Sequence, residues 1–232
     1  MAPCRAATAN TLILHKENNA SMTSVATESL RDQLWNRRYD ENIAPITELC
    51  DTLAEARPEQ QVAYVDPVHD VDECKIISLF SNVGEMDESG FITAGDEQAA
   101  TRLLGIHWQI GLRPSLVMPW NVHPWFTPGE PNGRLTAPQI EQGLRPLVKF
   151  MTLVPRASAL VAHGTEAHRL ADQLLKAQGP MLYKRGFGIY KVRSLSGRSF
   201  AGSPERQEQW LLESAKAYAE SMTRNGIPVK GR

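Results

Sequence analysis

The sequence predicts an α/β protein with a three-layer α/β/α architecture, in which helices cover both faces of a four-stranded parallel sheet. Three observations indicate this fold. Four short apolar segments have the length of buried strands, a segment with helical periodicity follows each of them, and polar or glycine-bearing residues come directly after every strand. A strand and a helix repeated four times are typical of parallel strands joined by crossover helices.

Two helices are expected ahead of the sheet, at 27–38 and 42–56, where apolar residues recur at helical spacing. Arg57-Pro58 ends the second one, because the residue before a proline disfavours helical geometry. Residues 1–25 are small and polar without a period, so we expect a flexible N-terminus there and a single domain over 26–232.

The sheet and its crossover helices follow in order. The predicted strands are 75–80, 115–118, 158–162 and 188–193. The predicted helices are 96–109, Thr136 to about Thr152, Gly164 to about Gln178-Gly179-Pro180, and 203–224. Asp96 and Glu97 suit a helix N-terminus, and Thr136-Ala137-Pro138-Gln139 fits a capping box with a proline in the first turn. Long loops are expected at 81–95 and 119–134.

Composition limits the class of protein. The chain has 232 residues, with 25 Lys and Arg against 26 Asp and Glu, so bulk positive charge cannot carry nucleic-acid binding. No apolar stretch approaches the roughly 20 residues of a membrane span, and residues 1–20 hold no run of signal-peptide type, so we expect a cytoplasmic protein. Cys4, Cys50 and Cys74 are too few and too widely spaced for a disulfide framework, a zinc site or an iron–sulfur cluster, so no metal is expected.

Charge is unevenly distributed along the chain. Residues 180–206 carry six basic side chains against Glu205 alone, which suits a phosphate backbone or, alternatively, a solvated basic surface. Residues 66–97 carry nine acidic side chains against Lys75 alone. This acidic stretch either faces away from a DNA-binding rim or reads an unusual ligand.

The residues that follow the strands define a candidate site. The segments are Ser81–Gly84, Trp120–His123, His163–Thr165 and Ser194–Ser199. Because the carboxyl ends of parallel strands meet at one edge of the sheet, all four should converge there.

Five segments in this order resemble one family. They are Phe80-Ser81-Asn82-Val83-Gly84, Ser89–Thr93, Met118–Trp125, Ala159–Ala167 and Ser194–Ser199. From about Val65 to Arg224 the set resembles the uracil-DNA glycosylase superfamily, as a divergent member. Its first segment is similar to Gly-Ile-Asn-Pro-Gly of the mismatch-specific branch, with Val83 where the pattern has proline. The resemblance implies that Asn82 positions the attacking water; the alternative is an asparagine of a turn or helix cap.

The resemblance also implies three base-binding residues. Phe91 would stack on the extruded base, and Asn121 would read the edge of that base with an amide that both donates and accepts. His123 would line the same pocket. The structural alternatives are an ordinary core phenylalanine and a solvated loop histidine.

The remaining matched residues are implied to face the DNA backbone. Gly164 opens a helix whose N-terminus would meet a phosphate, and Ser196 and Ser199 match phosphate contacts. Arg198 falls on the wedge that fills the space left by the flipped nucleotide. Ser194, counted with these residues, stands where the family has His or Asn. The group that stabilises a departing uracil anion is therefore absent or replaced, with His123 and Arg193 as candidate replacements.

The resemblance thus implies a monofunctional DNA glycosylase that flips and hydrolytically excises a modified or damaged base. No cofactor or metal is expected, the partner is DNA and not a membrane, and a monomer is expected. One candidate substrate is a bulky modified pyrimidine of phage DNA, removed in antiviral defence; ordinary repair of uracil or deaminated bases is the alternative. A catalytically inactive DNA-binding module is a second possibility. A third is a small-molecule enzyme whose acidic stretch, with Asp66, His69, Asp70 and Asp72, binds a cation or metal-bound ligand.

Overall fold

The computed structural model describes residues 30–81, 89–127, 134–197 and 199–230. The chain divides into an N-terminal unit that ends at Arg37 and a second unit that begins at Arg38. In the first unit, residues 30–36 are helical, within the helix predicted over 27–38. The predicted flexible N-terminus, 1–25, lies outside the described residues. A 3-10 turn, η1, covers Arg37–Tyr39.

The second unit contains a four-stranded sheet. Its strands are β1 (Ile76–Phe80), β2 (Val117–Asn121), β3 (Ala159–His163) and β4 (Gly188–Val192). They pair in the order β2-β1-β3-β4, and every pair is parallel. The first three strands are buried along their whole length, as expected for a parallel sheet covered on both faces. The prediction of a four-stranded parallel sheet is confirmed.

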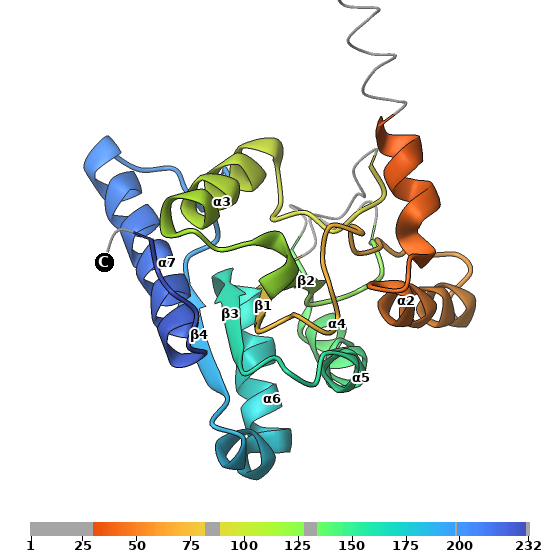
Figure 1. Ribbon diagram of the computed structural model, residues 1–232. Helices are drawn as coiled ribbons and strands as arrows, with labels where there is room; N and C mark the ends of the chain where they lie inside the picture. The colour runs from red at the N-terminus through yellow and green to blue at the C-terminus, as the bar shows by residue number, and fades with distance from the viewer. Residues whose placement is uncertain (1–29, 82–88, 128–133, 198, 231–232) are drawn as a thin grey trace, which may run out of the picture. The chain divides into compact units, whose positions relative to one another are not determined.

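Helices cover both faces of this sheet (Figure 1). On one face lie α3 (Glu97–Ile110) and α7 (Pro204–Arg224), which share a hydrophobic cluster with the sheet. On the other face, α2 (Ala44–Ala56), α5 (Leu144–Leu153) and α6 (Gly164–Lys184) share a second cluster. The short helix α4 (Ala137–Gln142) packs against α5 and α6. The three-layer α/β/α architecture is therefore confirmed.

Strand β2 runs further than predicted. The sequence predicts a strand over 115–118 and a loop from Pro119, whereas residues 114–116 form a 3-10 turn, η2 (Pro114–Leu116), and the strand ends at Asn121. The amide of Val122 donates to the carbonyl of Phe80 at 2.7 Å. Because alternate residues of a strand turn to opposite sides, the backbone of Pro119 faces away from β1, toward the outer edge of the sheet. Its missing N–H therefore removes no ladder hydrogen bond.

Two helices also differ from the prediction. The helix expected from Thr136 to about Thr152 begins with the predicted capping box but is split at Gly143 into α4 and α5. A Cβ atom on Gly143 would lie 1.7 Å from the carbonyl oxygen of Val122, so only glycine allows this close approach. Helix α6 continues through Pro180 to Lys184 because Leu182 is buried in the core.

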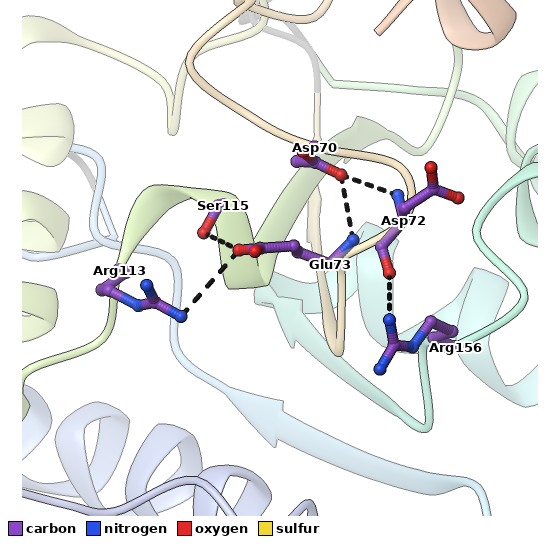
Figure 2. Close-up of polar contacts among 6 residues, drawn as sticks. All are labelled: Asp70, Asp72, Glu73, Arg113, Ser115 and Arg156. Carbon is purple, nitrogen blue, oxygen red and sulfur yellow. Dashed lines mark hydrogen bonds and ion pairs between the residues drawn. The ribbon is translucent and has the colours of Figure 1, made fainter. Parts of the chain in front are cut away.

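The acidic segment ahead of β1 lies at the amino ends of the strands. The Glu73 carboxylate accepts from Ser115 Oγ at 2.6 Å and pairs with Arg113 at 3.9 Å, while Arg156 donates to the carbonyl of Asp72 (Figure 2). The three partners precede β2 or β3, as Glu73 precedes β1. This part of the acidic stretch therefore lies opposite the carboxyl ends, where the candidate site was predicted.

Candidate functional site

The sheet has a switch point between β1 and β3. The crossover from β1 leads to β2 on one side, and the crossover from β3 leads to β4 on the other. Ligands of parallel α/β sheets bind in the crevice that such a reversal opens at the carboxyl ends of the strands. A cavity of about 1150 Å³ is found there. Its floor and walls include Phe80 and Ser81 after β1, and His163 and Gly164 after β3.

Four predicted DNA-facing residues converge on this cavity: Gly164, Ser194, Ser196 and Ser199. Gly164 has a φ of 85°, and a Cβ atom on it would lie 2.9 Å from the Cβ atom of Ser194. Glycine is therefore required both by backbone conformation and by space. The hydroxyls of Ser194 and Ser196 lie 2.9 Å apart and share a hydrogen bond. All four segments after the strands were predicted to converge at one rim. Residues of the segments after β1, β3 and β4 line this cavity, Ser81, Gly164 and Ser194 among them, whereas Trp120–His123 after β2 does not.

Side chains of α3 hold the loop that follows β4. Asp96 caps its own helix through Oδ1, which accepts from Ala99, and its Oδ2 accepts from the amide of Gly197 at 2.7 Å. Arg102 donates to the carbonyl of Leu195 at 2.7 Å. The sequence predicts Asp96 as a helix-starting residue, but nothing local to it signals a contact with a loop 100 residues away.

Arg193 is engaged within the same loop. Its Nε donates to the carbonyl of Ser199, and its guanidinium lies 3.9 Å from the centre of the Trp210 ring on α7. Arg193 lines the cavity. Through its hydrogen bond to Ser199 and its stacking on Trp210, Arg193 joins the loop after β4 to α7.

The three predicted base-binding residues do not line this cavity within the described residues. Phe91 is buried where residue 91 bridges to Tyr64. Asn121 is buried at the end of β2, in register with Phe80. His123 is fully buried, with Nδ1 2.9 Å from the carbonyl of Gln139, because the extension of β2 carries this segment under α4. Their roles on a flipped base remain predictions.

Two further predicted site residues, Asn82 and Arg198, lie outside the described residues. Ser81, which directly precedes Asn82, lines the cavity and donates to the carboxylate of Glu166. Glu166 also accepts from the amide of Leu135 at 2.9 Å. These contacts join the end of β1 to the first turn of α6.

The cavity walls carry both signs of charge, but the carboxylates are engaged. Asp96 and Glu166 accept the hydrogen bonds given above, Glu213 accepts from Gln209, and Glu220 pairs with Lys216 at 3.8 Å. By contrast, Arg134 and Arg169 line the cavity without a hydrogen bond or ion pair to any residue that the structure describes. Hydrogen bonds from neutral donors leave the carboxylates charged, so the lining carries four acidic side chains against five Lys and Arg, of which Arg134 and Arg169 have no partner among the described residues.

A buried polar chain runs beneath the cavity. Tyr218 Oη lies 2.7 Å from Ser78 Oγ and 2.8 Å from His163 Nε2. Burial lowers the pKa of His163 to about 3, so the imidazole is neutral. The sequence singles out His163-Gly164-Thr165 only as the end of a strand. The hydrogen bond between His163 and Tyr218 on α7 is seen only in the folded structure.

The comparisons with known proteins give no family. No model of a known protein family matches the chain, and a search of curated proteins finds no match.

Within the described ranges, no helix has both the length and the apolar character needed to cross a membrane. The same residues contain no group of three or more His, Cys, Asp or Glu that could hold a metal ion, so Asp66, His69, Asp70 and Asp72 do not form such a site.

Proposed function

We propose that the chain is a DNA glycosylase, which extrudes a modified or damaged base and hydrolyses its bond to the deoxyribose. The observation that carries the proposal is the meeting of Gly164, Ser194, Ser196 and Ser199 in one cavity at the switch point of the sheet. These are the residues that the resemblance assigns to the DNA backbone, and they come from segments 30 residues apart.

The chemistry of the cavity suits a phosphate. The N-terminus of α6, a helix of 21 residues, begins at Gly164 and offers unpaired backbone N–H groups at its positive end. Serine hydroxyls donate from the facing loop, and Arg134 and Arg169 supply charge. Phosphate contacts of this kind position a protein on DNA without reading its sequence.

The size of the cavity favours a large extruded group. Its volume of about 1150 Å³ exceeds the roughly 300–1,000 Å³ that is ordinary for small-molecule sites. A bulky modified pyrimidine of phage DNA, removed in antiviral defence, is therefore the substrate that we favour over uracil or another deaminated base. Asn82 is proposed to position the water that attacks the sugar, as the resemblance implies.

The test is release of the base. We would incubate the chain, with Asn82→Ala beside it, with duplexes that carry uracil, hypoxanthine or glucosylated hydroxymethylcytosine, and then cleave abasic sites with alkali. Strand breaks by the unmodified chain, lost in Asn82→Ala, are the expected result. Breaks at uracil alone would reject the bulky substrate. Tight binding of every duplex without an abasic product would reject catalysis and leave the inactive binding module, which Ser194 in place of His or Asn favours.

Arg134 and Arg169, which have no hydrogen-bond or ion-pair partner among the described residues, give a separate test of DNA binding. Each of Arg134→Gln and Arg169→Gln should reduce the salt dependence of binding by about one phosphate contact, whatever the sequence of the duplex. Arg145→Gln is the matched control, since Arg145 is exposed on α5 and does not line the cavity. Equal salt slopes for all three variants would place DNA elsewhere.

A further inference from the structure

We propose that the outer face of α3 is the contact surface of a weak, two-fold symmetric dimer of this chain. The inference does not depend on the proposed function, and it differs from the monomer expected from the sequence. Two observations carry it. Large apolar side chains are exposed near the middle of α3, and the two ends of the same helix carry opposite charges.

Leu104 and Trp108 form the apolar centre of this face. Their side chains are 68% and 75% exposed, and they lie one turn apart, so they share one side of the helix. The opposite side, with Ile106 and Ile110, is buried in the cluster that α3 shares with the sheet and α7. Single exposed apolar residues are ordinary, but two neighbours of which one is a tryptophan form a patch typical of an interaction site.

Gly105 allows a second helix to come close to this patch. It is exposed, and no atom lies within 4 Å of a Cβ atom added to it. Packing within the chain therefore does not require a glycine here, although glycine is unfavourable inside a helix. Without a side chain at this point, the backbone of α3 is accessible to a partner helix.

The charges at the two ends of α3 have opposite signs. Glu97 is the first residue of the helix and is exposed. Lys230 lies at the other end, where its amide donates to the carbonyl of Ile110 at 2.9 Å and its ammonium group is 4.9 Å from the centre of the Trp108 ring. Neither Glu97 nor Lys230 forms an ion pair with any residue that the structure describes.

This arrangement is complementary to itself. Glu97 comes seven residues before Leu104, and Ile110, which holds Lys230, comes six residues after it. A two-fold axis across the helix near Leu104 therefore places α3 of a second copy in antiparallel orientation, with the two apolar centres in contact. Glu97 of each copy then lies beside Lys230 of the other, and the opposed helix dipoles attract. A partner with charge of one sign would match only one end, so a second copy is the occupant that the face fits.

The size of the face sets the strength of the dimer. The 14 residues of α3 span about 21 Å. A standard interface covers about 800 Å² on each partner, more than one helix of this length supplies, so we expect a dissociation constant on the order of 10–100 μM.

The antiparallel arrangement leaves the cavities open. Helix α3 follows β1 and precedes the parallel strand β2, so it starts at the carboxyl ends of the strands, where Asp96 lines the cavity, and runs toward their amino ends. The cavities of the two copies therefore point in opposite directions.

Sedimentation velocity of the full chain, from about 10 μM to about 1 mM, is the first test. We expect the sedimentation coefficient to rise with concentration from that of a monomer to that of a dimer. Trp108→Glu should abolish the rise, and Leu104→Gln should weaken it. Tyr183→Glu is the matched control, because Tyr183 is 88% exposed on α6, on the other face of the sheet. A monomer at every concentration would overturn the proposal, as would equal behaviour of Trp108→Glu and Tyr183→Glu in variants that circular dichroism shows to be folded.

Reversal of charge tests the antiparallel arrangement. Glu97→Lys and Lys230→Glu should each raise the dissociation constant about tenfold or more, because each places like charges together at both ends of the interface. The double variant restores opposite charges and should return the constant to within about threefold of that of the unmodified chain. A double variant weaker than either single one would overturn the pairing of Glu97 with Lys230.

Gly105→Gln separates docking from stability. Glutamine favours the helix more than glycine does, so the Tm of the monomer should rise. The same side chain stands between the two helices, so association should weaken. A variant that dimerises as well as the unmodified chain would overturn the close approach at Gly105.

Discussion

The junction between Gly164 and Ser194 gives the sharpest prediction for stability. In Gly164→Ala, the backbone keeps a left-handed conformation at a φ of 85°, which costs about 1–2 kcal/mol for a residue with a Cβ atom. The new methyl group also lies 2.9 Å from the Cβ atom of Ser194, and such crowding costs about 1–3 kcal/mol. The reduced freedom of the unfolded chain returns about 0.4–1 kcal/mol. The net expectation is a loss of about 1–5 kcal/mol in the free energy of unfolding.

Gly179→Ala is the matched control. Gly179 lies in the same helix, α6, with no positive φ and no atom within 4 Å of an added Cβ. Alanine there should stabilise the chain by about 0.5–1 kcal/mol, since glycine is a poor residue inside a helix. Both variants would be measured by urea and thermal unfolding followed by circular dichroism.

The unfolding experiment has a clear refuting result. For a chain of this size, the loss in Gly164→Ala corresponds to a fall in Tm of roughly 2–20 °C, while the Tm of Gly179→Ala should rise by a few degrees. If both variants shifted Tm in the same direction by the same amount, the close approach of the α6 N-terminus to the loop after β4 would be wrong. The site built on that contact would then be wrong as well.

Three further predictions concern other parts of the fold. Gly143→Ala, whose methyl group meets the backbone carbonyl of Val122 at 1.7 Å, should destabilise the chain by about 3 kcal/mol or more in urea unfolding. Burial raises the pKa of Cys74 to about 12, so a thiol reagent at pH 8 should label it only after denaturation, and rapid labelling of Cys74 itself in the native chain, located by peptide mass spectrometry, would contradict this. Burial lowers the pKa of His107 to about 4 and of His163 to about 3, below the ordinary value of 6.5. The unfolded chain therefore binds more protons, and stability should be constant above pH 7 and fall by up to about 1.4 kcal/mol per pH unit for each histidine below pH 6. Urea midpoints that do not change between pH 7 and 5 would contradict it.

The sequence predicts the sheet well because each strand is a local pattern. Residues 76–80 are apolar apart from Ser78, residues 159–162 are a continuous apolar run, and runs of that kind can be found without knowledge of their neighbours. Strand β2 was predicted less well. Whether Pro119 breaks a strand depends on whether that strand lies at an edge, and strand order is not a local property.

Residues of the candidate site also differ in whether local sequence pattern predicts them. Gly164 and Ser194 could be predicted because they lie one and two residues beyond the ends of β3 and β4, so their place at the rim follows from topology alone. The anchors Asp96 and Arg102 could not, since their second partners are about 100 and 93 residues away. The hydrogen bonds of Tyr218 with His163 and with Ser78 could not be predicted either, since they join residues 55 and 140 positions apart that meet only in the folded core.

The two edges of the sheet have a consequence for the behaviour of the chain at high concentration. Strand β2 is buried along its whole length, and Pro119 on its outer side offers no hydrogen atom to an incoming strand. At the other edge, β4 has five residues and carries Lys191, whose ammonium group pairs with Asp172 at 2.6 Å. An added strand would meet a missing donor on one side and a short, charged border on the other. We therefore expect the sheet to resist growth into fibrils, and Pro119→Val with Lys191→Val to remove that resistance.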